Sequence, residues 1–413
     1  MKIRGLVAIT ALALSFLNAP ASEARNQPAD IFSSKSISQI TITISDKSAG
    51  NIARAPKVSV PARFAISNES GSLKYNNLPV DFHLKGTSTL RQNPSLVSSR
   101  PSLRVKFHQN GAIKLPFLGS MNSLTLNSMT QDQSKIHEYT AYKLYNAMGV
   151  PAPRVGYAKV TVVIGGRSYD KGLFAIIEPY DDAFLEKRFE TRTQHLFEPC
   201  GHWTDVTRPG TSKGIDTCDN AVFEVKEGWK SVPNKLDLRA LSSIQKLADN
   251  SQWWTAMDRY TDRDEFIRMW AVENFISAWD SYSGAIINNY YLRSDSMGVF
   301  TMLPTGADET FAYNFKMDAT SIGYPLIYDN FQLQTKNRGI MFTRCLNFKP
   351  CRNQYLDTLR TVKEKAASIK LKSSVDQISS MLDGTPTWGQ IAVKNWIDMK
   401  SKDVDALLLK YGR

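Results

Sequence analysis

The hydrophobic periodicity of this chain changes along its length, and the change limits the folds that the chain can adopt. From Ile40 to Phe107, apolar and polar residues alternate in short segments separated by Asn, Gly, Ser and Pro, which is typical of strands joined by hairpins. From Leu236 onward the pattern is mainly helical. This order of elements predicts an α+β fold in two lobes, β-rich at the N-terminus and mainly α-helical at the C-terminus.

Local signals place the elements between these regions. Apolar residues at helical spacing over 136–148 predict a helix that ends at Gly149. The Gly165-Gly166 pair predicts a hairpin. Asp181 or Asp182 is expected to cap a short helix that follows it.

We expect the β-rich lobe to span residues 36–180 and the helical lobe residues 181–413. Residues 190–234 are rich in Gly, Pro, Thr and charged side chains, and are expected to form an irregular insertion in the helical lobe. The helices expected after this insertion span 238–248, 262–278, 339–348, 352–369 and 388–410.

The first residues have the pattern of a secretory signal peptide. Lys2 and Arg4 precede an apolar run from Leu6 to Leu17, and small residues suited to cleavage follow. The run is too short to cross a bilayer, and we expect no membrane span later in the chain. Residues 1–24 are therefore predicted to be a signal peptide that directs the protein to a secreted or periplasmic location.

The four cysteines agree with export. Cys200 with Cys218, and Cys345 with Cys351, form two short-range pairs that predict two disulfides in an oxidising compartment. Zinc binding is the alternative, but the chain has no CxxC pair and only 5 histidines.

The formal net charge is +12, and loss of Lys2, Arg4 and Glu23 with the signal peptide leaves 12 − 2 + 1 = +11. A basic balance suits an anionic surface, a nucleotide or nucleic acid as partner. The basic residues are spread out, without an arginine-rich run or an aromatic RNA-binding strand, so specific nucleic-acid binding is not expected.

The segment from Asn274 to Phe311 carries the residues most suggestive of chemistry. Asp280, Asn289 and Asp308 follow one another along a helix end, a loop and a hairpin. Magnesium-dependent phosphoryl transfer needs a carboxylate that orients the accepting hydroxyl and oxygen ligands that hold the metal. Aspartates near strand ends also serve as caps and turn residues, so the spacing alone leaves both interpretations open.

Five ordered blocks of this sequence resemble the CotH kinase family of spore-coat-type kinases, which are related to protein kinases. The match includes LKGTSTLRQ, RPSLRVKF, GLFAIIEPYDDAFL, and a YYL strand before a turn that ends in DETF. The blocks span residues 84–92, 100–107, 126–154, 172–185 and 274–311.

The resemblance implies a two-lobed protein-kinase-like fold that binds ATP and Mg²⁺ between the lobes and phosphorylates a protein substrate in the envelope or outside the cell. Asp280 resembles the catalytic aspartate, and Asn289 and Asp308 would ligate Mg²⁺. Transfer of a nucleotidyl or glutamyl group on the same fold is an alternative.

Cofactor-binding residues are expected in the β-rich lobe. Arg104 and Lys106 are two apart on one strand and point to the same face. A cation there would hold the nucleotide phosphates, with Lys106 preferred and a solvated strand face as the alternative. Gly86 and Ser88 lie in a turn that could approach phosphate oxygens, or could be an ordinary hairpin turn.

Two glutamates are further candidates. Glu178 matches a family glutamate at the junction of the lobes, which implies a place near the nucleotide base or ribose; the alternative is a strand-end charge. Glu138 lies on the helix where a kinase-like lobe needs a partner for the phosphate-binding lysine, although a helical glutamate is usually solvated.

The sequence departs from the family in the turn from Pro304 to Phe311. The family shows PWDLDxTF there, whereas this chain has PTGADETF and has lost the tryptophan and the first aspartate. Asn288 also stands where the family often has histidine. A catalytically inactive envelope or coat binding protein, a pseudokinase, is therefore the main alternative to an enzyme.

Overall fold

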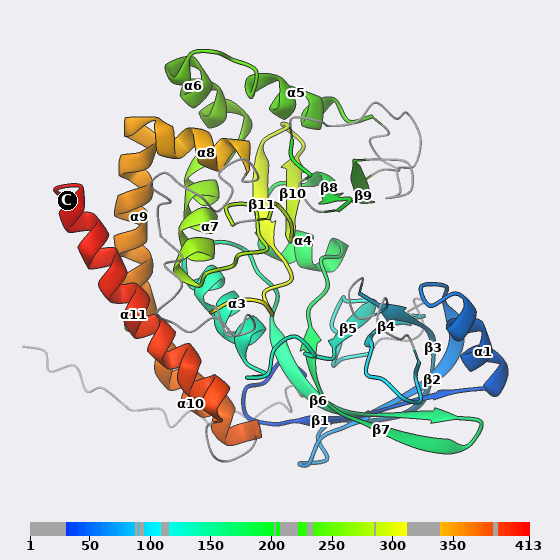
Figure 1. Ribbon diagram of the computed structural model, residues 1–413. Coiled ribbons are helices and arrows are strands. Elements are labelled where there is room, and N and C mark those ends of the chain that lie inside the picture. Colours follow the sequence, from blue (N-terminus) through cyan, green and yellow to red (C-terminus); the bar gives the residue numbers. More distant parts are fainter. Residues whose placement is uncertain are drawn as a thin grey trace, which may run out of the picture.

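The computed structural model describes most of the chain beyond the N-terminal segment. The predicted signal peptide and Cys218 lie outside the described residues, which are 30–86, 90, 95–108, 115–201, 204–206, 222–228, 234–284, 286–311, 339–382 and 387–413. Figure 1 shows a β-barrel below, and a second sheet with most of the helices above it.

Seven strands close the barrel in the order β1-β2-β3-β4-β5-β7-β6, with β1 and β6 paired in parallel and the other neighbours antiparallel. This confirms the predicted β-rich region and adds its closure into a barrel. The strands are β1 (Ser38–Ile44), β2 (Val60–Ser67), β3 (Lys74–Lys85), β4 (Ser102–Phe107), β5 (Ser123–Asn127), β6 (Val155–Ile164) and β7 (Arg167–Ile177).

Alternation along the strands fills the barrel with apolar side chains. Phe64, Phe82 and Phe107 point inward from β2, β3 and β4, and all three are buried. Along each strand, the residues next to these inward-facing ones point out of the barrel, because successive side chains of a strand point to opposite faces. A helix that the sequence did not predict, α1 (Asp46–Arg54), joins β1 to β2 and is capped by the Ser45 hydroxyl.

Two predicted elements follow the barrel strands closely. The helix expected over 136–148 is α3 (His137–Ala147), and the Gly165-Gly166 hairpin joins β6 to β7. The Asp181 carboxylate accepts a hydrogen bond from the Phe184 amide and caps α4 (Asp182–Arg188).

A second sheet contradicts the expectation of a wholly irregular insertion. Its order is β11-β10-β8-β9, formed by β10 (Tyr290–Asp295), β11 (Phe300–Pro304), β8 (Thr193–Pro199) and β9 (Phe223–Glu227). The last two strands lie within 190–234. They form because β8 pairs with β10, which is about a hundred residues later and invisible to local composition.

The C-terminal region is helical, as predicted, but with different boundaries. The helix expected over 238–248 is α5, which begins two residues earlier and ends at Ile244. A helix that the sequence did not predict, α6, follows it, and the Asp249 side chain caps α6 by accepting from the Gln252 backbone amide. An unpredicted helix also follows Lys370, whose φ of +52° ends the preceding helix. The helices are α5 (Leu236–Ile244), α6 (Asn250–Tyr260), α7 (Arg263–Phe275), α8 (Ile340–Asn347), α9 (Lys349–Ser368), α10 (Leu371–Leu382) and α11 (Trp388–Lys410).

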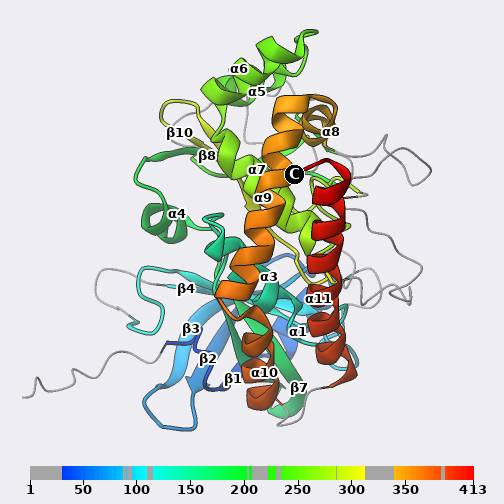
Figure 2. The same cartoon turned by 90° about the vertical axis from the view of Figure 1, so that its left-hand side faces the viewer.

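Helix α7 lies at the centre of this region, buried on nearly every side and in contact with α3, α9 and β11. Helices α9 and α11 run side by side along one flank, and α11 extends from the level of the barrel to the helical part (Figures 1 and 2). The predicted disulfide between Cys345 and Cys351 links α8 to α9. Cys200 is also disulfide-bonded. None of the described helices is long and apolar enough to cross a membrane.

Candidate active site

Asp280 and Asn289, two of the residues singled out from the sequence, lie in contact. Asp280 lies in the loop after α7, and its Oδ2 accepts hydrogen bonds from the side-chain amides of Asn288 and Asn289, both at 3.0 Å. Asn289 has a φ of +48°, a left-handed conformation that asparagine tolerates better than most residues. This turn directs its side chain back toward the Asp280 loop at the start of β10.

The turn that carries Asp308 packs against the same asparagine. The Nδ2 atom of Asn289 also donates to the carbonyl of Gly306 at 3.3 Å. Gly306 has a φ of +58°, and a Cβ atom placed there would lie 2.6 Å from the Asn289 side chain. The position of the family's first aspartate is therefore filled by the Asn289 side chain, and a side chain at 306 would displace it.

Lys85, Glu138 and Asp308 converge from β3, α3 and the turn after β11. Burial lowers the pKa of Lys85, and nearby carboxylates raise it, Glu198 first and then Glu138 and Asp308. Burial raises the pKa of Glu138 well above its usual value; Asp308 raises it further and Lys85 lowers it. Burial also raises the pKa of Asp308, which His137 and Lys85 lower. A cation thus faces two carboxyl groups that repel each other.

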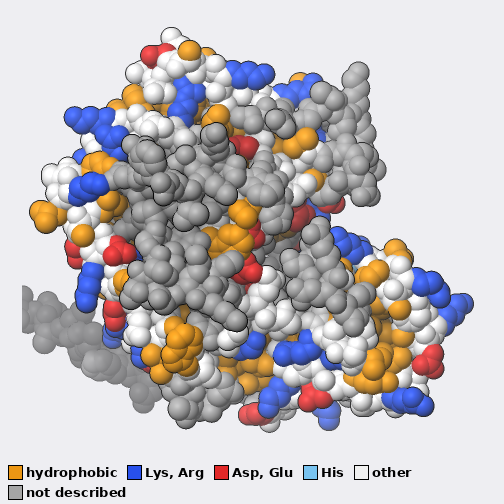
Figure 3. Space-filling model, viewed as in Figure 1, with side chains coloured by type: hydrophobic (Ala, Val, Ile, Leu, Met, Phe, Trp, Pro, Cys, Tyr) orange, Lys and Arg blue, Asp and Glu red, His pale blue; other side chains and the backbone are white. Residues whose placement is uncertain are grey.

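Two of these three side chains are partly open to solvent. Lys85 is exposed to solvent and Asp308 is half-buried, yet desolvation is the largest influence on the pKa of each. A side chain can be exposed and still be desolvated when water reaches it from one side and protein surrounds it on the other sides. Figure 3 shows the molecule hollowed between the barrel and the part above it. Charged groups that are partly desolvated but still open to solvent suit a charged ligand.

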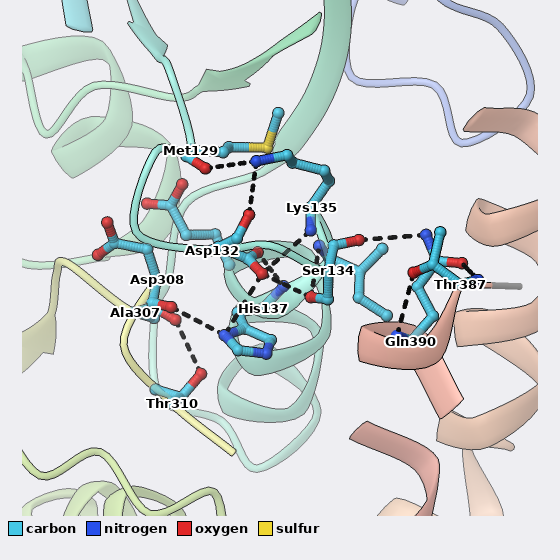
Figure 4. Close-up of polar contacts among 12 residues, drawn as sticks. Met129, Asp132, Ser134, Lys135, His137, Ala307, Asp308, Thr310, Thr387 and Gln390 are labelled. Atoms are coloured by element: carbon cyan, nitrogen blue, oxygen red, sulfur yellow. Dashed lines mark hydrogen bonds and ion pairs between the residues drawn. The ribbon is translucent and has the colours of Figure 1, made fainter. Parts of the chain in front are cut away.

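The loop before α3 holds this arrangement in place. The Asp132 carboxylate accepts from the backbone amide of His137 at 2.9 Å, and His137 Nδ1 lies 2.8 Å from the carbonyl oxygen of Asp308 (Figure 4). Glu138 is the next residue of the helix. The Glu138 carboxylate in turn accepts a hydrogen bond from the side-chain amide of Asn127 at 2.8 Å. The start of α3 is thereby tied to both the barrel and the Asp308 turn.

Arg104 and Lys106 face outward from the same side of β4, as predicted. Arg104 donates to the hydroxyls of Thr125 and Ser123 at 3.0 and 2.9 Å, and its pKa is lowered by burial. Lys106 is exposed and lies two residues further along the strand. The strand register pairs Lys85 with Ser102, at the opposite end of β4 from Lys106. The lysine brought to Glu138 and Asp308 is therefore Lys85.

The structure places Glu178 outside this group. Glu178 is only 3% exposed, and its carboxylate accepts from the Arg154 side chain at 2.8 and 3.0 Å and from Arg188 at 3.1 Å. These ion pairs connect the end of β7 with α4 and leave the carboxylate engaged. Gly86 directly follows Lys85 with a φ of +105°, and Ser88 lies outside the described residues.

The loop that carries Asp280 is supported by a buried carboxyl group. Glu273 of α7 accepts from the backbone amide of Ser283 at 3.0 Å and from its hydroxyl at 2.5 Å. Glu273 is 1% exposed, and burial raises its pKa to about 7, although the hydrogen bonds from Ser283 oppose the rise. Glu273 thus holds the loop at Ser283, three residues after Asp280.

The donor set suits magnesium bound together with a nucleotide. Among the residues that the structure describes, no three His, Cys, Asp or Glu side chains are grouped as a metal ion would require. Mg²⁺ in phosphoryl-transfer sites uses one or two carboxylates and completes its coordination with phosphate oxygens and water. Asp308 and the Oδ1 atom of Asn289 supply hard oxygens of this kind.

The sequence did not indicate that Lys85, rather than Lys106, lies near Glu138 and Asp308, and it indicated Glu138 only weakly. For Glu138 a signal was present, because it precedes the buried Tyr142 and Tyr145 by one and two helical turns and so belongs to the apolar face. For Lys85 the only signal was its outward position at the end of an alternating strand.

The chain was compared with family models, curated proteins and solved structures, and the family model agrees with the resemblance seen in the sequence. The model of the CotH kinase protein family matches residues 82–401, well over half of the chain. A search of curated proteins finds no match. The crystal structure of a Helicobacter pylori proinflammatory kinase, CtkA, is similar with a TM-score of 0.39 and 7% identity, covering 75% of this chain and 95% of that one. A Shewanella oneidensis MR-1 toxin–antitoxin complex of HipA and HipB with operator DNA gives a TM-score of 0.37 and 12% identity, covering 75% of this chain and 65% of that one.

Proposed function

Because the chain belongs to the CotH kinase protein family, we propose that it is an exported atypical kinase that binds ATP and Mg²⁺ and transfers phosphate to a protein hydroxyl. The nucleotide would lie between a β-rich lobe, residues 36–180, and a mainly helical lobe, residues 181–413. The observation that carries the proposal is the convergence of Lys85, Glu138 and Asp308 from three separate elements beside the Asp280–Asn289 pair.

Each group has a role that its surroundings support. Lys85 would contact the nucleotide phosphates as a compact cation, and Glu138 would hold the lysine in position. Asp308 and Asn289 would ligate Mg²⁺, which when bound neutralises charge on the phosphates. Asp280, whose Oδ2 is fixed by two amides, would orient the accepting hydroxyl and take its proton.

Arg104 is the second cation available to the nucleotide. It lies on the outward face of β4 and interacts electrostatically with Tyr291 and Asp181, which belong to the part of the molecule above the barrel. A guanidinium in this position can contact phosphate oxygens through two donors. Lys106, on the same outward face of β4, would remain solvated and would not contact the nucleotide.

Export is supported by two features. The first residues have the signal-peptide pattern, and the Cys345–Cys351 disulfide is typical of an oxidising compartment. The acceptor would then be a protein of the envelope or of the extracellular space. The basic net charge would favour an anionic surface nearby.

The main alternative is a pseudokinase that serves as a binding protein. Its support is Gly306, which replaces the family's first aspartate and whose space is filled by Asn289. A chain with one metal-binding carboxylate fewer would hold Mg²⁺ less tightly. Transfer of a nucleotidyl or glutamyl group would use the same nucleotide and metal residues, and analysis of the reaction product distinguishes it from phosphorylation.

The test is thermal stability of the disulfide-intact protein with and without Mg·ATP. A ligand present at about 100 times its dissociation constant stabilises the folded state by about 2.7 kcal/mol, which raises the melting temperature by roughly 5 °C. Lys85→Ala should weaken Mg·ATP binding by about 10- to 100-fold, because a hydrogen bond to a charged group is lost. The matched control Lys106→Ala removes a lysine from the same face and should bind like the wild type.

The outcomes separate the assignments. Weakened binding in Lys106→Ala with normal binding in Lys85→Ala would return the phosphate-binding role to Lys106. No shift of the wild-type melting temperature at millimolar Mg·ATP would exclude the nucleotide site and favour the binding-protein alternative.

A further inference from the structure

The N-terminus of the last helix contacts the loop that precedes α3 (Figure 4). Thr387 and Gln390 form a capping box, in which the Thr387 amide donates to Gln390 Oε1 at 2.8 Å and the Thr387 hydroxyl accepts from the Gln390 amide. The other end of the Gln390 side chain leaves its own helix: Nε2 donates to the Ser134 carbonyl at 3.1 Å. Gln390 is fully buried.

From Ser134 the hydrogen bonds continue inward. The Ser134 hydroxyl donates to Asp132 Oδ1 at 2.6 Å, and the backbone amide of Lys135 donates to the same oxygen at 3.0 Å. The Lys135 ammonium donates to the carbonyls of Met129 and Asp132 at 2.6 and 2.7 Å. Ser134 and Asp132 are almost wholly buried. Water therefore has little access to replace these bonds, and the loop has one well-determined conformation.

The network ends at the candidate active site. Asp132 Oδ2 accepts from the His137 amide, and His137 Nδ1 contacts the carbonyl of Asp308. The residue after His137 is Glu138, and the residue that supplies the carbonyl is the proposed metal ligand. Movement of the loop would therefore displace both carboxyl groups together.

We propose that Gln390 is a positioning residue for Asp308 and Glu138, acting through Ser134, Asp132 and His137. The proposal rests on the proposed function, and it assigns the start of α11 to the active site although Gln390 lies 82 residues beyond Asp308 in the chain. The capping box by itself requires only the Gln390 Oε1 atom. The Gln390 Nε2 atom is not needed for the cap and instead donates to Ser134, in the loop before α3.

The experiment compares Gln390→Ala with two controls. Gln245→Ala removes another buried glutamine, which accepts from the Trp253 indole and donates to the Leu241 carbonyl away from this network. Thr387→Ala removes the capping hydroxyl but keeps the glutamine that contacts Ser134. Each variant is measured well below its melting temperature, for Mg·ATP affinity and, without any ligand, for hydrogen exchange.

The exchange probes are the amides of His137 and Phe311. The first is bonded to Asp132 and the second to the carbonyl of Ile276 at 2.6 Å. Loss of one buried hydrogen bond from the network predicts exchange about fivefold faster at both amides in Gln390→Ala, and Mg·ATP affinity lower by about the same factor. Both controls should match the wild type in these two measurements.

The two measurements separate this proposal from the proposed function. If the wild type binds no Mg·ATP, the proposed function fails and exchange alone decides: faster exchange only in Gln390→Ala supports the positioning role, and equal exchange in Gln390→Ala and Gln245→Ala overturns it. If the wild type binds Mg·ATP but Gln390→Ala binds it equally well, the positioning role is overturned while the proposed function stands.

Discussion

Replacing Asp308 by asparagine should abolish magnesium-dependent nucleotide binding and, in the same protein, stabilise the ligand-free fold at pH 7. The first effect follows from the loss of the proposed carboxylate ligand, and we expect an affinity for Mg·ATP lower by more than about 100-fold. The second follows from the environment of Asp308. Burial and the Asp132 carboxylate raise its pKa, so ionisation at neutral pH destabilises the folded state, and asparagine does not ionise.

The sign of the second effect follows from linkage. A carboxyl group whose pKa is raised on folding contributes most to stability below its unfolded pKa, and this contribution is lost as the pH rises through the folded pKa. Asp308→Asn should therefore melt above the wild type at pH 7, with a smaller difference at pH 4. Calorimetry at both pH values and isothermal titration with Mg·ATP measure the two effects.

The opposite signs distinguish a functional carboxylate from a structural one. Asp249→Ala is the structural control, because it removes the carboxylate that caps α6, outside the proposed metal site. This variant should lose stability and keep its Mg·ATP affinity. An Asp308→Asn protein that binds Mg·ATP like the wild type would contradict the metal assignment, and one that is less stable at pH 7 would show a structural role for the carboxylate.

The part of the site that could be predicted from the sequence lies within one continuous segment. Asp280, Asn289 and Asp308 are joined by a single hairpin, so the hairpin alone brings the last two close together. The side chain of Asn289 then bridges the Asp280 loop and the turn at Gly306.

The lysine could not be predicted in the same way. Strand alternation places Lys85, Arg104 and Lys106 on one outward face, and it gives no information on which end of that face lies near Asp308. The register of β3 against β4 and the closure of the barrel decide this, since Ser102 lies opposite Lys85 and Asp81 lies opposite Lys106. The closure depends on pairings between strands that are distant in sequence, such as β1 with β6, and β3 and β4 are joined by a segment too long to fix their register as a tight turn would.

The second sheet shows the same limit at the level of the fold. The residues of β8 and β9 lie in a segment whose composition is typical of loops, and they become strands because β10 provides an edge. The same sheet carries Glu198, the carboxylate with the strongest influence on the pKa of Lys85. A segment whose composition is typical of loops thus supplies a strand residue whose charge acts on Lys85.

A buried carboxyl group on α7 makes the stability of this protein depend on pH. Burial raises the pKa of Glu273 to about 7, whereas in an unfolded chain the pKa of glutamate is about 4.3. Below the unfolded value Glu273 is protonated in both states. As the pH rises toward 7, the unfolded chain releases its proton first, so the folded state loses about 3 kcal/mol of relative stability.

Glu273→Gln should remove this loss, because glutamine can accept the two hydrogen bonds from Ser283 through its Oε1 atom and does not ionise. We expect the variant to be more stable than the wild type by about 3 kcal/mol at pH 8 and nearly equal to it at pH 4, measured by urea unfolding across this range. Glu69→Gln removes one negative charge from an exposed position and should leave the pH dependence as it is in the wild type.

If the stability of Glu273→Gln fell with pH as steeply as that of the wild type, the carboxyl group would have to be ionised in the folded protein. In that case the loop carrying Asp280 would be held by a buried carboxylate, and Glu273→Gln should instead loosen the loop and lower the stability at every pH above 5.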